Sequence, residues 1–85
     1  MEARYLDLIE RIRDAKFRTT RLSPGYDDQE VDNFLDRLVA TLRGSGLPDY
    51  SEVRNIAFAR TRLRPGYAMK DVDRFLSEIA EAIRT

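Results

Sequence analysis

The sequence contains no cysteine and no histidine. Disulfides, thiolate metal sites and the usual zinc, haem and nucleophile–base arrangements are therefore excluded. Acidic and basic residues number 15 each, so the net charge of zero provides no overall field that would favour nucleic acid. No apolar run approaches membrane-spanning length, and the N-terminus lacks the apolar stretch of a signal peptide. We therefore predict a cytoplasmic protein that is not an enzyme and holds no cofactor or metal.

What the sequence does contain is an internal repeat. Its 85 residues suit one small domain, or two halves of one. Residues 21–26 read RLSPGY, and residues 62–67, which follow 41 positions later, read RLRPGY. When residues 12–43 are laid over 53–84 without a gap, 13 of 32 positions are identical. A register that continues through a connection and a helix indicates a duplication.

Apolar residues at intervals of three and four predict helices in both copies and no strand anywhere. The first helix covers about residues 2–16. The second starts from Asp27 as its N-cap, with Glu30 completing a capping-box pattern. The glycine-rich segment 44–46 ends this second helix and links the two copies.

The second copy repeats this plan with a shorter first helix. Asp49 or Ser51 provides its N-cap, and the helix reaches Phe58. The last helix has a weaker start, because Ala68 stands where the first copy has Asp27.

Between the helices of each copy, a Pro-Gly pair predicts a type II turn, at residues 23–26 and 64–67. Proline sets φ at the second position of such a turn, and glycine accepts positive φ at the third. The residues expected to define the turns are Pro24, Gly25, Tyr26, Pro65, Gly66 and Tyr67.

The side chains around each turn have expected partners within their own copy. We expect the two tyrosines to brace each turn against the helix that follows it. Asp32 and Asp73 are expected to accept hydrogen bonds from the turn backbone, or from an arginine such as Arg21 or Arg62.

The long helix of each copy carries a wide apolar stripe. The predicted core seam consists of Val31, Phe34, Leu35, Leu38, Leu42, Val72, Phe75, Leu76, Ile79 and Ile83. Phe17 and Phe58 continue these apolar faces, so we place all four phenylalanines in the core. The four-three-four spacing within the stripes matches a coiled-coil seam, although each stripe is shorter than two heptads.

The predicted fold is all-α, with two tandem helix–turn–helix repeats. They pack as a pseudo-twofold four-helix unit or a short antiparallel bundle. Residues 1–43 form the first repeat, 44–48 the linker and 49–85 the second repeat. The same contacts could instead be shared between two chains, so the protein is predicted to be a monomer or a homodimer.

The pattern F-x-x-T-R-L-x-P-G-Y followed by V-D-x-F-L resembles the N-terminal domain of the DivIVA family, and is most similar to the short repeats of actinobacterial DivIVA-domain proteins. It covers residues 17–38 and 58–79. The resemblance implies a cytoplasmic, membrane-associated scaffold of cell division or polar growth in Gram-positive bacteria. It also implies partners among division or polar-growth proteins.

The resemblance further implies that the loop before each Gly-Tyr pair contacts the membrane. In the family, an exposed apolar side chain dips into the inner leaflet while basic neighbours sit over anionic headgroups. The residues that could do so here are Leu22 with Arg18 and Arg21, and Leu63 with Arg60, Arg62 and Arg64. Two features depart from the family. Ser-Pro and Arg-Pro replace Phe-Arg before Gly-Tyr, and the long C-terminal coiled coil is missing, which favours a small adaptor or accessory protein over a self-assembling scaffold.

Charge is unevenly distributed, with basic residues around the two turns and acidic residues on the long helices. If both turns lie at the same end of the molecule, they form a cationic end suited to an anionic membrane surface. Alternatively, the arginines pair with the acidic helices, Leu22 and Leu63 tuck under their turns, and the protein is a soluble adaptor with no lipid contact. Nucleic-acid binding ranks last, because the long helices are acidic.

Overall fold

The computed structural model describes residues 3–44 and 46–84, so residues 1–2 and 85 at the ends of the predicted repeats, and Ser45 in the predicted linker, lie outside the described residues. The described residues are mostly helical, as predicted. Their elements, in chain order, are α1 (Ala3–Arg13), β1 (Gly25–Tyr26), α2 (Asp28–Gly44), α3 (Tyr50–Asn55), β2 (Arg60–Thr61) and α4 (Met69–Arg84). The prediction of no strand is wrong, because β1 and β2 form a two-stranded antiparallel sheet.

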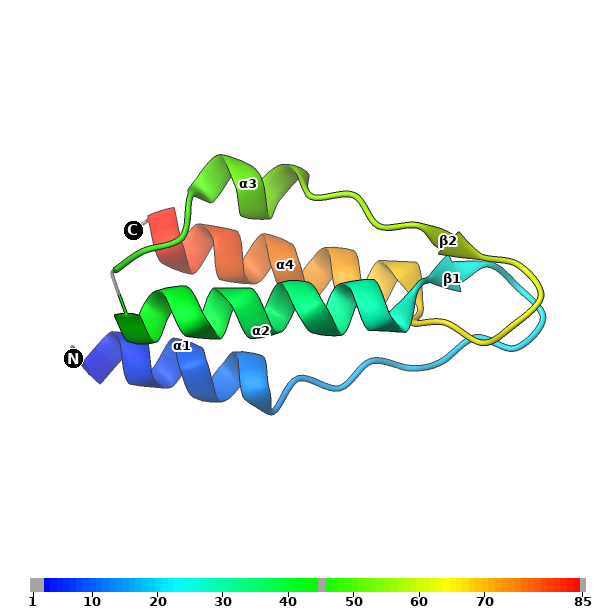
Figure 1. Cartoon of the computed structure of the whole chain (residues 1–85), viewed down its shortest axis with the longest axis horizontal. Helices are drawn as coiled ribbons and strands as arrows, with labels where there is room; N and C mark the ends of the chain where they lie inside the picture. Colours follow the sequence, from blue (N-terminus) through cyan, green and yellow to red (C-terminus); the bar gives the residue numbers. More distant parts are fainter. Residues whose placement is uncertain (1–2, 45, 85) are drawn as a thin grey trace.

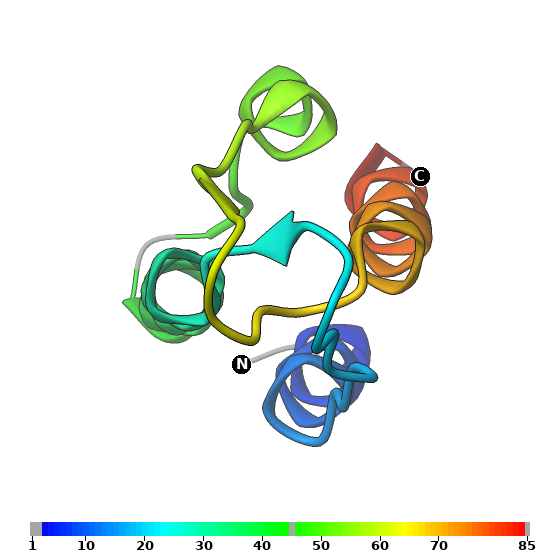
Figure 2. The ribbon, with the colours of Figure 1, turned by 90° about the vertical axis from the view of Figure 1, so that its right-hand side faces the viewer.

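The helices lie lengthwise in an elongated molecule that measures 42 × 22 × 17 Å (Figure 1). Helices α1 and α3 run toward one end, and α2 and α4 run back from it. Helix α1 packs against α2, and α3 packs against α4. Both long connections therefore reach the same end of the molecule, where Figure 2 shows them passing across one another in front of the helices.

The core lies between the helices and draws on all four of them. Its buried apolar residues are Leu8, Ile9, Ile12, Val31, Phe34, Leu35, Leu38, Leu42, Val53, Val72, Leu76, Ile79, Ala80 and Ile83. Every residue of the predicted seam is in this set except Phe75. Phe17, Phe58 and Phe75 are half-buried and pack against the set. The 3.6-residue period of the sequence thus identified the faces that the helices bury.

Helix α2 begins as the sequence predicts. The Asp27 carboxylate accepts hydrogen bonds from the backbone N–H groups of Gln29 and Glu30, at 2.9 and 3.2 Å. The prediction of a full capping box is wrong. The Glu30 carboxylate turns away from Asp27 and does not accept from its backbone N–H. It accepts from the backbone N–H of Ala59 in the other half of the chain, at 2.8 Å.

Helices α1 and α3 both end earlier than predicted. Helix α1 ends at Arg13 rather than near residue 16, and α3, with Asp49 as its N-cap, ends at Asn55 rather than at Phe58. Farther along each connection, the backbone pairs with the other half of the chain: the Arg18 carbonyl accepts from the Ala68 N–H and the Ala59 carbonyl from the Asp27 N–H, both at 2.8 Å.

Candidate functional site

The loop end is built from two connections, residues 14–27 and 56–68, which pair with each other. In the sheet, Gly25 lies opposite Thr61 and Tyr26 opposite Arg60. Tyr26 and Tyr67 exchange both backbone hydrogen bonds, each at 2.9 Å. Each connection is thus held by the other half of the chain.

The predicted type II turns are wrong. Among the described residues, Gly46 is the one glycine with positive φ, so Gly25 and Gly66 do not supply the left-handed conformation that this turn needs. The chain bends instead at residues 21–23 and 62–64, ahead of the prolines.

The glycines are needed for a close approach of two backbones. A Cβ on Gly25 would lie 2.7 Å from the carbonyl oxygen of Tyr67, and one on Gly66 would lie 2.5 Å from that of Tyr26. Both distances are shorter than real Cβ atoms show, so a side chain at either position would force the two connections apart.

We call this close approach of the two connections, at Gly25 and Gly66, the crossing. Two threonines complete it, and sequence analysis assigned them no role. The Thr61 hydroxyl lies within hydrogen-bonding distance of both backbone groups of Gly25, at 3.3 and 3.4 Å. The Thr20 hydroxyl makes the same contacts with Gly66, at 3.2 and 3.4 Å. Their identity at matched positions of the repeat was the signal that could have identified them.

The two tyrosines cross between the halves as well. The Tyr26 hydroxyl donates to the Asp73 carboxylate at 2.7 Å, and the Tyr67 hydroxyl donates to Asp32 at 2.8 Å. The predicted partners of both aspartates, the turn backbone or Arg21 and Arg62, are therefore wrong. Each tyrosine braces its connection against the long helix of the other half instead of its own.

This crossing also shifts the acidity of the tyrosines. Burial, followed by the hydrogen bond to Asp32, raises the pKa of Tyr67 to about 12. The pKa of Tyr26 is raised by burial and by its bond to Asp73. Both hydroxyls therefore remain protonated donors throughout the neutral pH range.

Two arginines of the loop end are tied to acidic groups. Arg18 donates from Nη2 and Nε to Asp71 at 2.7 and 3.0 Å, and Arg64 contacts Asp27 at 2.7 Å. The hydrogen bonds from Arg18 lower the pKa of Asp71 to about 2. The alternative that arginines pair with the acidic helices thus holds for these two residues.

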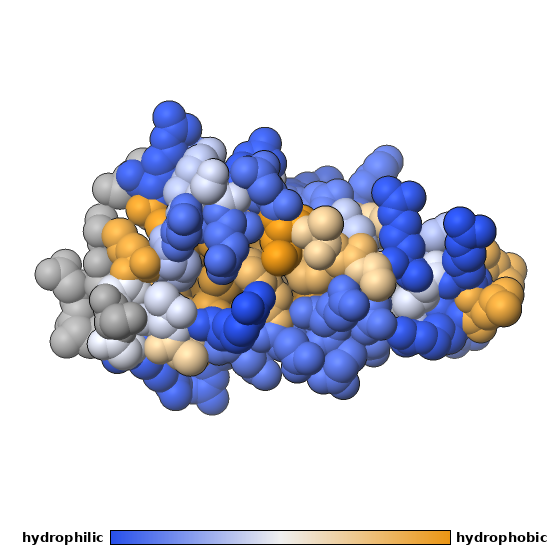
Figure 3. Space-filling model, turned by 45° about the horizontal axis from the view of Figure 1, so that its top comes forward, coloured by the Kyte–Doolittle hydropathy of each residue, from blue (hydrophilic) through white to orange (hydrophobic). Residues whose placement is uncertain are grey.

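The remaining basic residues of the loop end are free of such pairs. Within the described parts of the chain, Arg21, Arg60 and Arg62 are exposed and have no carboxylate within 4.0 Å. Leu22 and Leu63 are 99% and 101% exposed, so neither leucine is tucked under its connection. Figure 3 shows the resulting apolar patch at the loop end, bordered by hydrophilic side chains.

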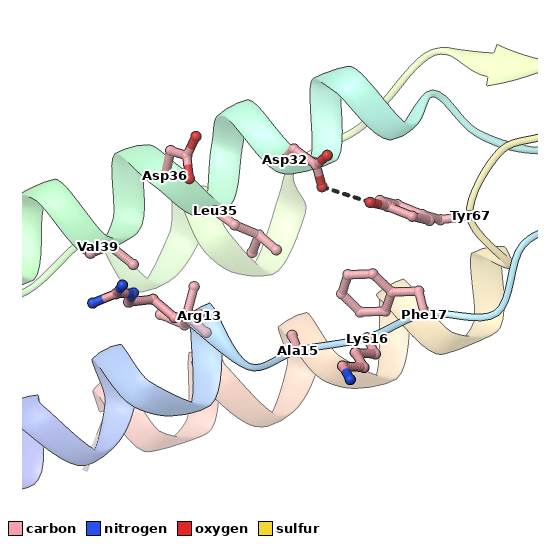
Figure 4. Close-up of a pocket in the computed structure, with 10 residues that line it drawn as sticks. Arg13, Ala15, Lys16, Phe17, Asp32, Leu35, Asp36, Val39 and Tyr67 are labelled. Atoms are coloured by element: carbon pink, nitrogen blue, oxygen red, sulfur yellow. Dashed lines mark hydrogen bonds between the residues drawn. The ribbon is translucent and has the colours of Figure 1, made fainter.

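A second feature is a groove of about 650 Å³ along α1 and α2 (Figure 4). Its lining comprises Ile12, Arg13, Ala15, Lys16, Phe17, Asp32, Leu35, Asp36, Val39 and Tyr67. Sequence analysis placed two of these residues, Phe17 and Leu35, in the core and did not predict a groove. The sequence did contain one signal for it: a small residue, Ala15, stands where the second repeat has the larger Ile56.

The described residues offer little to other kinds of site. Within residues 3–44 and 46–84, no group of His, Cys, Asp and Glu side chains is arranged to hold a metal ion. None of the helices in these residues combines the length and the apolar character needed to cross a membrane. No family model matches the chain, and neither the curated proteins nor the solved structures include one that is significantly similar to it.

Proposed function

We propose that this chain is a DivIVA-like module of cell division or polar growth that contacts the anionic inner surface of the membrane with its loop end. One observation carries the proposal: Leu22 and Leu63 are both fully exposed and flank the paired strands β1 and β2, close to Arg21, Arg60 and Arg62, which have no ion-pair partner among the described residues. A leucine exposed to this degree on each of two neighbouring loops is costly in water and suited to an apolar phase. The cellular role rests on the sequence resemblance alone.

The size of each contribution favours reversible, peripheral binding. Full burial of one leucine contributes roughly 1.5–3 kcal/mol. Each basic group near an anionic surface contributes about 1 kcal/mol and is screened by salt. Arg21, Arg60 and Arg62 would supply this attraction, whereas Arg18 and Arg64 are already partly neutralised by carboxylates.

The proposed architecture is a pseudo-twofold unit of two tandem helix–turn–helix repeats within one chain. It is supported by contacts that recur 41 positions apart, such as Tyr26 to Asp73 and Tyr67 to Asp32. A two-fold arrangement places both connections at one end and makes each the support of the other. Two leucines on a braced platform lose less conformational freedom on binding than two leucines on independent loops.

Co-sedimentation with vesicles tests the membrane contact. The purified protein is mixed with anionic and with neutral vesicles at low and high salt, in parallel with the double variant Leu22→Asp/Leu63→Asp. We expect salt-sensitive binding to anionic vesicles that the double variant loses. Leu47→Asp is the matched control, because Leu47 is also exposed, at 42%, but lies between α2 and α3, away from the loop end.

Circular dichroism shows whether each variant is folded. Failure of the folded wild-type protein to bind anionic vesicles would reject the membrane contact. Equal loss of binding in Leu47→Asp would show that the effect does not come from the loop end.

A second candidate function, a soluble adaptor for a division or polar-growth protein, is favoured by the groove along α1 and α2. About 650 Å³ lies within the range of about 300–1,000 Å³ that is typical of ligand pockets. A photo-cross-linking residue at Val39 would report a bound partner in cells. Loss of the cross-linked product in a Lys16→Glu variant, together with an absence of vesicle binding, would favour the adaptor over the membrane module.

A further inference from the structure

Equivalent positions of the two repeats line two grooves of very different size. The larger groove, about 650 Å³, runs along α1 and α2. The smaller one, about 190 Å³, is lined by Val53, Arg54, Ile56, Asp73, Leu76 and Ser77. Each of these residues lies 41 positions after a residue that lines the larger groove. The small groove is therefore the counterpart of the large one, mostly closed.

The residue that closes it is Ile56. The open groove is lined by Ile12, Lys16, Asp36 and Val39, and the matched positions of the second repeat are Val53, Ala57, Ser77 and Ala80, of which Val53 and Ser77 line the small groove. Every one of these four differences removes side-chain atoms and would enlarge the groove. Ile56 in place of Ala15 is the one difference that adds bulk, and its half-buried side chain packs against the core.

The open groove combines an apolar floor with charges on its rim. Leu35 and Val39 from α2 face Phe17 across the groove (Figure 4). Arg13 and Lys16 lie on one side and Asp36 on the other. Within the described parts of the chain, none of these three charged groups has an ion-pair partner within 4.0 Å.

We infer that the chain has one partner-binding groove and fills the other with its own Ile56, so that it binds a single partner segment. The occupant is a segment of another protein that places a branched aliphatic side chain beside Ala15, where the second repeat has Ile56. An acidic residue next to that side chain pairs with Arg13 or Lys16. This inference rests on the adaptor function proposed above and adds the chemistry and the number of its partners.

The first experiment fills the open groove from within. Ala15→Ile introduces the side chain that the second repeat already accommodates, so we expect a higher melting temperature with an unchanged fold. Ile56→Ala should lower the melting temperature, because it empties the second groove, and Ile56→Val is the milder variant in case Ile56→Ala does not fold. A lower melting temperature for Ala15→Ile would overturn the proposal, since it would show that the groove does not fit an isoleucine.

The second experiment supplies the occupant as a peptide. The probe is a synthetic peptide with the sequence of residues 49–60, which carries Ile56 and, four residues earlier, Glu52. It is titrated into ¹⁵N-labelled protein. We expect saturable shifts at the amides of Ala15, Leu35 and Val39, and about tenfold weaker binding to the Ala15→Ile variant.

The control peptide carries Ile56→Asn and should cause no saturable shifts. Equal binding of both peptides, equal binding to wild type and Ala15→Ile, or no binding at all would each overturn the inference. Self-association of the wild-type protein that Ala15→Ile abolishes would also overturn it, because the occupant would then be a second copy.

These readouts separate the inference from the functions proposed above. Ala15→Ile leaves the leucines and arginines of the loop end unchanged, so vesicle binding should be unaffected by it. Peptide binding together with no cross-linked partner in cells would reject the adaptor function. It would still support the inference that the groove binds a branched aliphatic side chain beside Ala15.

Discussion

The two halves of the chain make the same threonine and tyrosine contacts with each other but differ in their ion pairs and in their exposed loops. Each contributes a threonine, a glycine, a tyrosine and an aspartate at matched positions of the crossing. Outside the crossing, the first half has Ala15 and Ser23 where the second has Ile56 and Arg64. A contact that joins the two halves constrains a residue in each of them, whereas a surface position belongs to one half alone.

The difference shows which positions are fixed by the fold and which are available for function. At Gly25 and Gly66, the carbonyl oxygens opposite leave no space for a Cβ, so no other residue fits at either position. Ala15 and Ile56 are both compatible with the fold, but one leaves a groove open and the other closes it. Contacts that recur 41 positions apart are therefore compatible with unlike surfaces beside them.

The largest predicted effect comes from breaking the crossing. Gly66→Ala places a Cβ 2.5 Å from the Tyr26 carbonyl oxygen, and Gly25→Ala places one 2.7 Å from that of Tyr67. We expect each to lower the free energy of unfolding by about 3 kcal/mol, the upper part of the usual range for overpacking, with Gly66→Ala the more severe. Urea denaturation followed by circular dichroism measures both.

Gly44→Ala is the control for these substitutions. Nothing lies within 4 Å of a Cβ at Gly44, which is in α2. Its stability should be unchanged or raised by at most about 1 kcal/mol, because alanine favours a helix more than glycine does. A Gly66→Ala protein as stable as Gly44→Ala would show that the two connections do not approach each other this closely.

The outcome of the sequence predictions follows the same division between local and crossing contacts. Helix periodicity identified the buried stripes, Asp27 was identified as an N-cap, and Asp49 was one of two candidates for the other, because these features depend on residues two to four positions apart. The type II turns and the partners of Asp32 and Asp73 were wrong. Those contacts join residues more than 30 positions apart, and local turn preferences contain no information about them.

The tyrosine–aspartate bonds are the next largest contribution. Tyr26→Phe and Tyr67→Phe each remove one hydrogen bond while the ring contacts remain, and we expect each to cost about 1 kcal/mol. The two costs should be equal within about 0.5 kcal/mol, since the two bonds occupy matched positions. A large effect of one variant beside none of the other would show that the halves are not equivalent at the crossing.

The raised pKa of Tyr67, caused by burial and then by the bond to Asp32, also predicts a loss of stability at high pH. The hydroxyl has a pKa of 10.0 when unfolded and about 12 in the folded protein, so its contribution is complete below pH 10 and is lost as the pH rises through 12. The melting temperatures of wild type and Tyr67→Phe should therefore converge over that window. A constant difference up to pH 12 would contradict the raised pKa.

A smaller effect tests the difference between the two loops. Ser23→Arg gives the first loop the residue of the second, but residues 68 and 69, which match Asp27 and Asp28, are Ala and Met and provide no carboxylate. The new arginine should remain unpaired and strengthen binding to anionic vesicles by about 1 kcal/mol, or about fivefold.

The matched variant is Arg64→Ser, which removes an arginine that is already paired with Asp27. It should weaken vesicle binding by much less than Ser23→Arg strengthens it. Equal and opposite changes would mean that the ion pair with Asp27 does not reduce the attraction of Arg64 to the membrane.

The smallest expected change concerns the exposed ion pair of Arg18 with Asp71, which has no charged counterpart, because the residue matched to Arg18 is Ala59. The hydrogen bonds from Arg18 lower the pKa of Asp71 from 3.8 in the unfolded chain to about 2. Its stabilisation is therefore complete above pH 3.8 and is lost as the pH falls through 2. We expect Asp71→Asn to melt slightly below wild type at pH 6 and to match it near pH 2, with high salt reducing the difference.

Glu30→Gln, at the matched position, removes no arginine pair, so its difference from wild type should respond less to salt. The Arg18 backbone N–H also donates to Asp71, at 3.0 Å, as the Ala59 N–H does to Glu30. A salt-independent difference for Asp71→Asn would assign the stabilisation to this backbone bond, and the halves would then be equivalent here as well.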